Sequence, residues 1–540
     1  METCYIENVT TLRGLPNVNH SKNAIAIKIP SKDNITYGQL HDLIEDTATL
    51  LTNIVGVDKG DVIAIPIPNS VEFVLSFLAV PWIRAVSAPL NPNYTEKEYK
   101  FYMEDNESKC VLVPKEGLPE AEAAAKDLSI PVYTVVWTAD SSRGGGGGSV
   151  KIVRKDNGEE AETVEDDDDG VESSETKKVK LTFAPDPDDI ALFLHTSGTT
   201  ARPKGVPLTH TNLLTSMDNI SRTYSLTPND TVLLIMPLFH VHGLMSALLS
   251  TLATGGSVIL PPQPKFSASL FWHNATVGNA TWVTCVPTIY QLLLLRYEKD
   301  YPSENPPKFR FVRSCSSALA PSILKEIESK FHAPCVEAYA MTEASHQMCS
   351  NPIEGQRKPG TVGKGTGVDV AILDKTNVVV TEPDTEGEVC IRGNNVTKGY
   401  IGANSEKINE EAFAGGWFHT GDQGILDADG YLQLTGRIKE LINRAGEKIS
   451  PLEVDAAMLG HSFVAEAVSF SMPDDIYGEV VAAAIVLKEG CKLDEKELQE
   501  FLVDKLIKFK IPVRVFFDTK LPKTPTGKIQ RRIVAAHFLK

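Results

Sequence analysis

Two stretches of this sequence carry residue types that suit phosphate chemistry. The first is a run of small hydroxyl residues ending in a lysine, Thr196-Ser-Gly-Thr-Thr-Ala-Arg-Pro-Lys204, and the second is Pro525-Thr-Gly-Lys528. Hydroxyls, backbone N–H groups and a lysine on a tight turn can hold the charged oxygens of a triphosphate. A second lysine near the C-terminus could stabilise charge at the reacting end. We therefore expect a nucleoside triphosphate site.

The first stretch is not a Walker loop, because Lys204 is followed by Gly205 and not by Ser or Thr. It resembles the phosphate loop of the adenylate-forming enzymes, the superfamily of acyl-CoA synthetases, adenylation domains and luciferases, which join a carboxylic acid to AMP. Those enzymes usually have Gly where this chain has Ala201, which removes some backbone freedom. The resemblance implies that ATP is bound by Thr196, Ser197, Gly198, Thr199, Thr200, Ala201, Arg202, Pro203 and Lys204.

A third motif, Tyr339-Ala-Met-Thr-Glu343, follows an apolar run. Taken alone, such a pentapeptide is more often an ordinary junction between a strand and a turn. Beside the phosphate loop it resembles the family's Tyr-Gly-Met-Thr-Glu. The resemblance implies that Tyr339 stacks on adenine, that Thr342 contacts the α-phosphate and that Glu343 coordinates Mg²⁺. A hard cation needs oxygen ligands, so a carboxylate at position 343 is also chemically sensible.

Two further positions match residues that bind the nucleotide in this family. Asp422 lies in Gly416-Trp-Phe-His-Thr-Gly-Asp422, and Arg437 lies in Thr435-Gly-Arg437. An aspartate can accept hydrogen bonds from both ribose hydroxyls, and an arginine can reach ribose or phosphate oxygens. A lone Asp in a glycine turn is usually only a turn residue. With its neighbours, we expect Asp422 and Arg437 to bind ATP.

The C-terminal region matches the moving part of the same family. Lys528 resembles the catalytic lysine that bridges the substrate carboxylate and the α-phosphate, where it also contacts ATP. Lys439 matches the hinge about which the small domain turns, and Gly446 matches the loop that lines the CoA tunnel. We expect Lys528, His240 and Thr342 to be the catalytic residues. Without its context, the Lys528 region would be a basic solvated tail or a nucleic-acid patch.

Three segments should line the acid pocket, and they are unusually polar. They are Pro237-Leu-Phe-His-Val-His242, the run that begins with Arg313-Ser314, and Ala344-Ser-His346. A fatty or aromatic acid needs an apolar tunnel, whereas the second carboxylate of a dicarboxylic acid needs hydrogen-bond donors or positive charge. We expect His240, Ser314 and His346 to bind the acid, with Arg313 further away. His242 is as consistent with a packed or capping role.

In some segments the resemblance is specific to one group of enzymes within the superfamily. These are the segments around the hydroxyl loop, the histidines, Arg313 and the Tyr339 motif. These segments closely resemble the oxalate-CoA ligases of plants and fungi. The resemblance implies a two-step ligase that uses oxalate, ATP, Mg²⁺ and CoA and releases AMP and pyrophosphate. A ligase for malonate or another short acid is the nearest alternative. A protein that binds nucleotide or RNA as a scaffold, without turnover, is an alternative of another class.

Composition places these motifs in a globular chain of more than one domain. The 540 residues are too many for a single core, and 42% hydrophobic residues is ordinary. The formal charge is −17, but eleven acidic residues lie between Asp156 and Glu175, so the remainder is only mildly acidic. That balance argues against nucleic acid as a main partner. Eight single cysteines with no CxxC pair predict a reducing compartment and no structural zinc.

The elements that must position the motifs alternate between apolar runs and helical patterns, as at 61–67, 70–80, 85–89, 95–105 and 110–113. Such alternation predicts an α/β fold of parallel sheets covered by helices. We expect a large domain that binds ATP and the acid at 1–437, with a flexible insertion at about 138–182. A small mobile α+β lid follows at 438–540, with helices at 451–459 and 494–506 and strands at 465–470, 480–487 and 513–517.

One segment could be mistaken for a membrane span, since 231–264 contains no charged residue. Proline and glycine interrupt it, which favours a buried strand, a helix at about 243–253 and a second strand. The N-terminal residues lack the features of a signal peptide, and Phe538-Leu-Lys540 is not a Ser-Lys-Leu type of peroxisomal address. We expect a cytoplasmic protein; import into peroxisomes by another route stays open.

Overall fold

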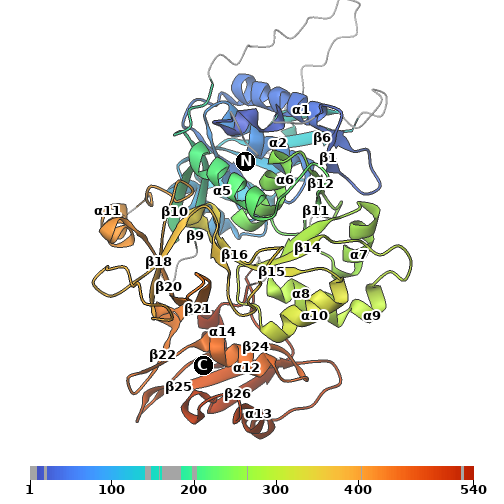
Figure 1. The fold of residues 1–540 in the computed structure, drawn as a ribbon. Helices are drawn as coiled ribbons and strands as arrows, with labels where there is room; N and C mark the ends of the chain where they lie inside the picture. Colours follow the sequence, from blue (N-terminus) through green and yellow to red (C-terminus); the bar gives the residue numbers. More distant parts are fainter. Residues whose placement is uncertain are drawn as a thin grey trace, which may run out of the picture.

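The computed structural model describes residues 9–17, 21–139, 148–156, 159–160, 184–196, 203–263, 265–402, 404–524 and 528–539. Strands and helices alternate over the first two thirds of the chain, as the sequence predicts. Figure 1 shows the C-terminal helices and strands gathered at the end of the molecule opposite α1 (Tyr37–Leu50). The fold class is α/β, with layered sheets and a smaller α+β unit after residue 437.

A nine-stranded sheet carries most of the acid-binding candidates. Six neighbouring strands in it run parallel, in the order β15-β14-β13-β11-β12-β1, and antiparallel strands extend both edges. Its strands are β1 (Ile25–Lys28), β2 (Ile35–Thr36), β11 (Thr231–Leu233), β12 (Ser257–Ile259), β13 (Trp282–Cys285), β14 (Phe311–Cys315), β15 (Cys335–Met341), β16 (His346–Ser350) and β17 (Lys364–Gly365).

An eight-stranded sheet holds the strands on either side of the hydroxyl loop. Its order is β10-β9-β4-β3-β5-β6-β7-β8, with parallel pairing from β9 to β6. The strands are β3 (Val62–Ile65), β4 (Val86–Pro89), β5 (Ser108–Pro114), β6 (Val132–Thr138), β7 (Ser149–Asp156), β8 (Glu159–Glu160), β9 (Ile190–Thr196) and β10 (Lys204–Thr209).

The prediction of a flexible insertion at about 138–182 is wrong for part of that range. Strand β7 pairs with β6 along its length, from Ser149 opposite Thr138 to Arg154 opposite Tyr133. Val150 and Ile152 are buried, because alternate residues of this strand face the hydrophobic core. Residues 140–147, 157–158 and 161–183 lie outside the described part of the chain.

Two smaller sheets follow. The first is antiparallel and consists of β18 (Asp369–Leu373), β19 (Gly387–Arg392), β20 (Phe418–Leu426) and β21 (Leu432–Arg437). The second consists of β22 (Ile442–Arg444), β23 (Glu447–Ile449), β24 (Val464–Asp474), β25 (Gly478–Leu487) and β26 (Arg514–Asp518). The predicted C-terminal helices and strands are all present, and the hairpin β22–β23 and helix α14 (Arg531–Phe538) are additions that the sequence did not reveal.

Helices cover the sheets and begin where the sequence supplies caps. Thr36, Thr95, Thr209 and Asp494 each close a capping box, in which the side chain accepts an N–H of the first turn. The remaining α-helices are α2 (Val71–Trp82), α3 (Glu96–Asp105), α4 (Pro119–Asp127), α5 (His210–Thr223), α6 (Ser250–Ala253), α7 (Ala268–Val277), α8 (Pro287–Leu295), α9 (Tyr297–Asp300), α10 (Pro321–Phe331), α11 (Ser405–Ala412), α12 (Pro451–Leu459) and α13 (Glu495–Leu502). Shorter helical turns are η1 (Leu12–Asn17), η2 (Leu51–Val55), η4 (His242–Leu249), η5 (Thr342–Ala344), η6 (Ala414–Gly416), η7 (Ile438–Glu440) and η8 (Lys508–Lys510).

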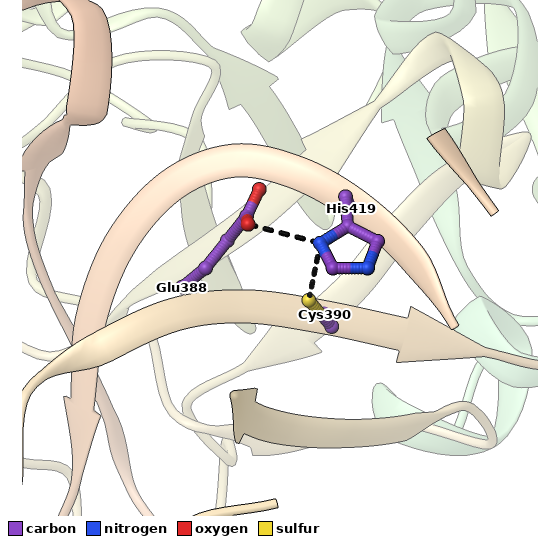
Figure 2. A group of neighbouring side chains, drawn as sticks. All are labelled: Glu388, Cys390 and His419. Carbon is purple, nitrogen blue, oxygen red and sulfur yellow. Dashed lines mark hydrogen bonds and ion pairs between the residues drawn. The ribbon is translucent and has the colours of Figure 1, made fainter. Parts of the chain in front are cut away.

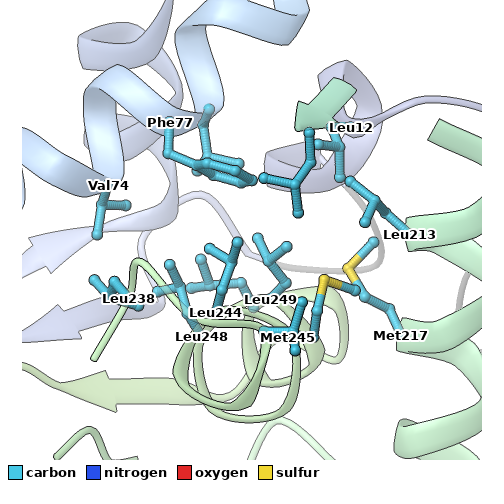
Figure 3. Close-up of a cluster of buried hydrophobic side chains, with 14 of the residues drawn as sticks. Leu12, Val74, Phe77, Leu213, Met217, Leu238, Leu244, Met245, Leu248 and Leu249 are labelled. Atoms are coloured by element: carbon cyan, nitrogen blue, oxygen red, sulfur yellow. The ribbon is translucent and has the colours of Figure 1, made fainter. Parts of the chain in front are cut away.

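The described residues of the uncharged segment form the predicted buried strand, helix and strand between Thr231 and Ile259. Its helical part begins as the π-helical turn η4 at His242 and continues into α6. Figure 3 shows leucines and Met245 of this segment packed between α2 and α5. Among the described residues, none of the helices is long and apolar enough to cross a membrane.

Separate hydrophobic clusters lie on either side of residue 437. The largest cluster runs from Leu12 to Leu432, whereas two clusters of the C-terminal part contain only residues between Ile442 and Val534. Each part therefore has a core of its own. The exact boundary at 437 and 438 stays a prediction.

Candidate active site

The hydroxyl loop joins two paired strands. Strands β9 and β10 are antiparallel, with Thr196 opposite Lys204, and Pro203 immediately precedes β10. Ser197, Gly198, Thr199, Thr200, Ala201 and Arg202 lie outside the described residues. The ammonium of Lys204 lies 4.5 Å from the ring centre of Tyr400, and burial lowers the pKa of Lys204. Lys204 begins β10 directly after the loop, and its contact with phosphate oxygens stays a prediction.

The two nucleotide-binding candidates from the antiparallel sheet lie side by side. Asp422 on β20 is paired in register with Arg437 on β21, and Arg437 Nε lies 3.0 Å from Asp422 Oδ1. The Tyr339 hydroxyl donates to the other carboxylate oxygen of Asp422. Burial raises the pKa of Asp422, and the positive charge of Arg437 opposes that rise. The structure thus brings Tyr339, Asp422 and Arg437 into one group.

Replacing Asp422 with asparagine should weaken ATP binding by about 10–100-fold, because a charged acceptor for the ribose hydroxyls is lost. The measurement is calorimetric titration of ATP into the full-length chain, beside thermal unfolding to verify the fold. Asp427→Asn is the control, since Asp427 lies just after the same strand and pairs with Lys358. Unchanged ATP affinity in Asp422→Asn would exclude the ribose role.

The Thr342-Glu343 pair lies on η5, directly after strand β15. Glu343 is buried, and its Oε1 accepts a hydrogen bond of 2.7 Å from the Tyr400 hydroxyl. Burial raises the pKa of Glu343, while the Tyr400 hydrogen bond and the charges of Arg437 and Lys204 lower it. A carboxylate supplies the oxygen ligands that a hard cation prefers, so Glu343 fits Mg²⁺. Tyr400 was missed by sequence reasoning, because an isolated tyrosine carries no motif.

Lys528 lies in the C-terminal unit and is hydrogen-bonded to Thr524. Its N–H donates to Thr524 Oγ1 at 3.0 Å, and the carbonyl of Lys528 accepts from the Thr524 N–H at 2.8 Å. Burial lowers the pKa of Lys528, as does the charge of Arg437, whereas Asp422 and Glu343 raise it. Lys528 therefore lies in the same electrostatic neighbourhood as the nucleotide-binding candidates.

The other two C-terminal candidates lie at the surface. Lys439 is exposed on η7, and its charge lowers the pKa of Lys204. Gly446 lies on the exposed turn between β22 and β23 with φ of +99°, and its N–H donates to Asn443 Oδ1. That backbone conformation favours glycine. The hinge role of Lys439 and the CoA role of Gly446 stay predictions.

A fully buried arginine lies behind the predicted acid pocket. Arg313 on β14 is 0% exposed and donates to the Tyr224 hydroxyl, Thr284 Oγ1, His346 Nε2 and Gln347 Oε1, at 2.8 to 3.1 Å. All four acceptors are neutral groups. Within the part of the chain that the structure describes, no carboxylate forms an ion pair with Arg313. A buried, uncompensated cation is costly and favours the approach of an anion.

Arg313 determines which nitrogen of His346 carries the proton. A guanidinium has donors only, so His346 Nε2 must accept the 3.1 Å hydrogen bond from Arg313. Burial and the charge of Arg313 hold the pKa of His346 well below its usual value, so the ring is neutral. Its single proton is therefore on Nδ1. This Nδ1–H is a buried donor without a partner among the described residues.

Two serines next to these residues are also unpaired. Ser314 Oγ and Ser345 Oγ are buried, and neither has a hydrogen-bond partner in the described structure. Ser345 and His346 have φ of +50° and +103°, a conformation that is uncommon for such residues and concentrates at functional sites. Sequence reasoning chose Ser314 and His346 but missed Ser345, whose only signal is its position directly before His346.

The two remaining histidines have different surroundings. His242 is fully buried, with Nε2 at 2.6 Å from Thr284 Oγ1 and Nδ1 at 3.1 Å from Ser316 Oγ, so it is a packed residue. His240 accepts the N–H of His242 on Nδ1 at 3.2 Å. Burial and the charge of Lys528 lower the pKa of His240 to about 3. His240 is therefore neutral, with its proton on Nε2, where it can donate to a substrate.

Strand β15 also holds a buried acid that makes stability depend on pH. Burial raises the pKa of Glu337 from 4.5 to about 8. Between these two values the folded chain keeps a proton that the unfolded chain has released, so the free energy of unfolding should fall as pH rises. The melting temperature of Glu337→Gln should not show this fall. Relative to the wild type, it should therefore rise between pH 5 and pH 8. Glu326→Gln, at an exposed position of α10, is the control, and parallel curves for wild type and Glu337→Gln would contradict the assignment.

The chain is similar to known proteins over nearly its whole length. Residues 16–401 match the family described as AMP-binding enzyme, and residues 453–528 match the AMP-binding enzyme C-terminal domain. An oxalate-CoA ligase of Arabidopsis thaliana is 49% identical over 95% of each chain. One from Saccharomyces cerevisiae is 46% identical over 96% of this chain and 95% of the relative. The crystal structure of ATP-bound MatB from Rhodopseudomonas palustris has a TM-score of 0.83 and 28% identity, and the alignment covers 98% of this chain and 99% of that one. On the extent of these matches, the chain belongs to the AMP-binding enzyme family.

Proposed function

We propose that this protein is an AMP-forming oxalate-CoA ligase. The observation that carries the choice of acid is the buried Arg313, which has only neutral partners and fixes His346 as an N–H donor. The names and identities of the Arabidopsis and yeast relatives support the same acid. Each chain is matched over nearly its full length, so the comparison covers the whole catalytic unit.

The charge of the acid decides between substrate classes. A fatty acid would place an apolar tail against unpaired donors and a buried cation, and those groups would lose water without gaining a partner. A second carboxylate accepts hydrogen bonds and compensates the positive charge. His346 Nδ1–H, His240 Nε2–H and Ser314 Oγ are the donors that we assign to this carboxylate. Arg313 acts on it through His346.

In the first step, one carboxylate oxygen of oxalate attacks the α-phosphorus of ATP. A new P–O bond forms, the bond to the bridging oxygen breaks, and pyrophosphate leaves, giving oxalyl-AMP. Lys528 stabilises the negative charge that accumulates at phosphorus, and Lys204 and the hydroxyl loop hold the phosphates. Thr342 contacts the α-phosphate, Tyr339 packs on adenine, and Asp422 and Arg437 bind the ribose. Glu343 would hold Mg²⁺, which neutralises phosphate charge when bound.

In the second step, the thiol of CoA attacks the acyl carbonyl of oxalyl-AMP. The C–S bond forms, the thiol proton is released, and AMP leaves with the electron pair of the broken C–O bond. The C-terminal unit turns at Lys439 between the two steps, which removes Lys528 and admits CoA past Gly446. The same active site therefore serves both reactions.

The test is a comparison of acids in CoA-dependent conversion of ATP to AMP, with oxalate, malonate, acetate and hexanoate. Malonate is one methylene longer and should have kcat/KM lower by about 10–200-fold. Acetate lacks the second carboxylate and should be lower by about 10⁴-fold, because buried donors stay unpaired. A preference for hexanoate or acetate would refute the choice of oxalate and leave the AMP-forming chemistry intact.

A further inference from the structure

A cluster of three possible metal ligands lies outside the proposed active site. Glu388 and Cys390 project from β19 and His419 from β20 (Figure 2). His419 Nδ1 lies 2.9 Å from Glu388 Oε2 and 3.5 Å from Cys390 Sγ, and the three donor atoms lie within 4.8 Å of one another. The proposed ligase reaction uses none of these side chains.

Hydrogen bonds around the cluster fix the orientation of its donors. His419 Nε2 lies 3.1 Å from the carbonyl oxygen of Ala414, and a carbonyl can only accept, so Nε2 carries a proton. In a neutral ring this leaves the Nδ1 lone pair directed at Glu388 and Cys390. A carboxylate oxygen cannot donate to that lone pair. Metal-bound histidines have this arrangement, with the distal N–H held by a backbone carbonyl.

The carboxylate is oriented in the same way. Glu388 Oε1 accepts the Gly421 N–H at 2.9 Å, which leaves Oε2 for the centre of the cluster. A thiolate, an imidazole and a carboxylate form a ligand set of zinc, and tetrahedral bonds of about 2.0–2.3 Å place ligand atoms about 3.3–3.6 Å apart. The sulfur-to-nitrogen distance of 3.5 Å already matches that spacing. The Glu388 oxygen lies 2.9 Å from Nδ1 and would move away from the ring to reach the same spacing.

We propose that Glu388, Cys390 and His419 bind one Zn²⁺ ion, with water as the fourth ligand. Cys390 is 0% exposed, whereas the side chains of Glu388 and His419 are 24% and 13% exposed, so solvent reaches the site from the carboxylate side. The absence of CxxC pairs predicted no structural zinc, but this site uses a single cysteine. Its ligands come from two paired strands, and residues 388 and 419 are brought together only by that pairing.

A nucleophilic role for Cys390 does not fit the geometry. In a relay of cysteine, histidine and acid, the nucleophile and the acid contact opposite nitrogens of the ring. Here both Cys390 and Glu388 contact Nδ1, and the other nitrogen is occupied by Ala414. The full burial of Cys390 also denies access to a substrate.

The ion would stabilise the strands that position Asp422. Gly421, which donates to Glu388, immediately precedes Asp422, and the Thr420 hydroxyl donates to the Val389 carbonyl at 2.7 Å. A cation shared by β19 and β20 would therefore hold this part of the sheet in one conformation. Its role is structural and does not depend on which acid the enzyme uses.

The experiment uses the full-length chain, stripped of metal and titrated with Zn²⁺ and with Co²⁺. We expect one tight Zn²⁺ site per chain and, with Co²⁺, the sulfur-to-cobalt charge-transfer band of a cysteine ligand. Cys390→Ala should abolish that band, and Cys390→Ala and Glu388→Gln should each weaken Zn²⁺ binding by at least about tenfold. Zn²⁺ should also raise the melting temperature of the wild type but not that of Cys390→Ala.

Two controls separate this site from others. Cys110→Ala removes an equally buried thiol from the eight-stranded sheet and should keep the band. Glu343→Gln removes the expected Mg²⁺ ligand and should keep it as well. A wild type without the cobalt band, or equal Zn²⁺ affinity in wild type and Cys390→Ala, would overturn the proposal. That outcome would mean that the three side chains form only hydrogen bonds with one another, and it would leave the ligase assignment intact.

Discussion

Replacing Lys528 with alanine should lower the rate of acyl-adenylate formation by about 10²–10³-fold, the usual effect of removing one group that stabilises transition-state charge. The half-buried ammonium lies near Asp422, Glu343 and His240, where the carboxylate of the acid and the α-phosphate would meet. Its charge acts most strongly when negative charge accumulates at phosphorus. ATP affinity should therefore change by less than about tenfold.

The measurement is the single-turnover rate of oxalyl-AMP formation from ATP and oxalate. Calorimetric titration measures ATP affinity in parallel. Lys523→Ala is a matched control five positions earlier, where the lysine pairs with Glu466 at 2.6 Å. A Lys528→Ala variant that forms the adenylate at the wild-type rate would remove Lys528 from the reaction. It would also revive the alternative of a nucleotide-binding scaffold, because a pure binder has no need for this lysine.

Replacing His346 with alanine should lower kcat/KM for oxalate by about 10–100-fold, the cost of losing a hydrogen bond to a charged group. The change also removes one of the two hydrogen-bond acceptors of Arg313 Nη2, so that only Gln347 Oε1 remains. The imidazole that links Arg313 to the acid is lost as well. ATP affinity should stay within about twofold, since the hydrogen-bond partner of His346 is Arg313 and, among the described residues, no hydrogen bond joins His346 to Tyr339, Asp422 or Arg437. His273→Ala, at an exposed position of α7, is the control.

Steady-state kinetics with oxalate and with malonate give the clearest result for His346→Ala. A second variant, His346→Gln, keeps a side-chain N–H donor and should recover part of the oxalate activity if the donor matters. Equal losses of ATP binding and of oxalate use would contradict the acid role of His346. Thermal unfolding of both variants then shows whether the substitution has damaged the fold.

Local sequence motifs predicted candidate residues that lie within strands or directly after them. Thr196 ends β9, Tyr339 and Asp422 lie within β15 and β20, and Thr342 directly follows β15. The alternation of apolar runs and helical patterns also predicted the α/β fold, since parallel strands buried on both faces give continuous apolar runs. Strand β7 was not predicted, because a glycine run and an acidic run flank its short alternation of apolar and polar residues.

Contacts between distant segments could not be predicted in this way. Arg313 was expected to be a remote contributor, yet its position depends on Tyr224 at the end of α5, Thr284 on β13 and Gln347 on β16. These partners come from three separate elements and form no sequence pattern. The tautomers of His240 and His346 depend on the same tertiary packing. Sequence supplied the residue types, and the fold determined which nitrogen is available.

The most direct test of the assigned chemistry is exchange of labelled pyrophosphate into ATP, measured with oxalate and without CoA. The assignment predicts exchange that requires oxalate and Mg²⁺, because oxalyl-AMP forms reversibly before CoA takes part. It also predicts that Lys528→Ala suppresses this exchange. Exchange that is absent with oxalate but present with malonate or hexanoate would contradict the oxalate assignment, and no exchange with any acid would contradict the adenylate mechanism itself.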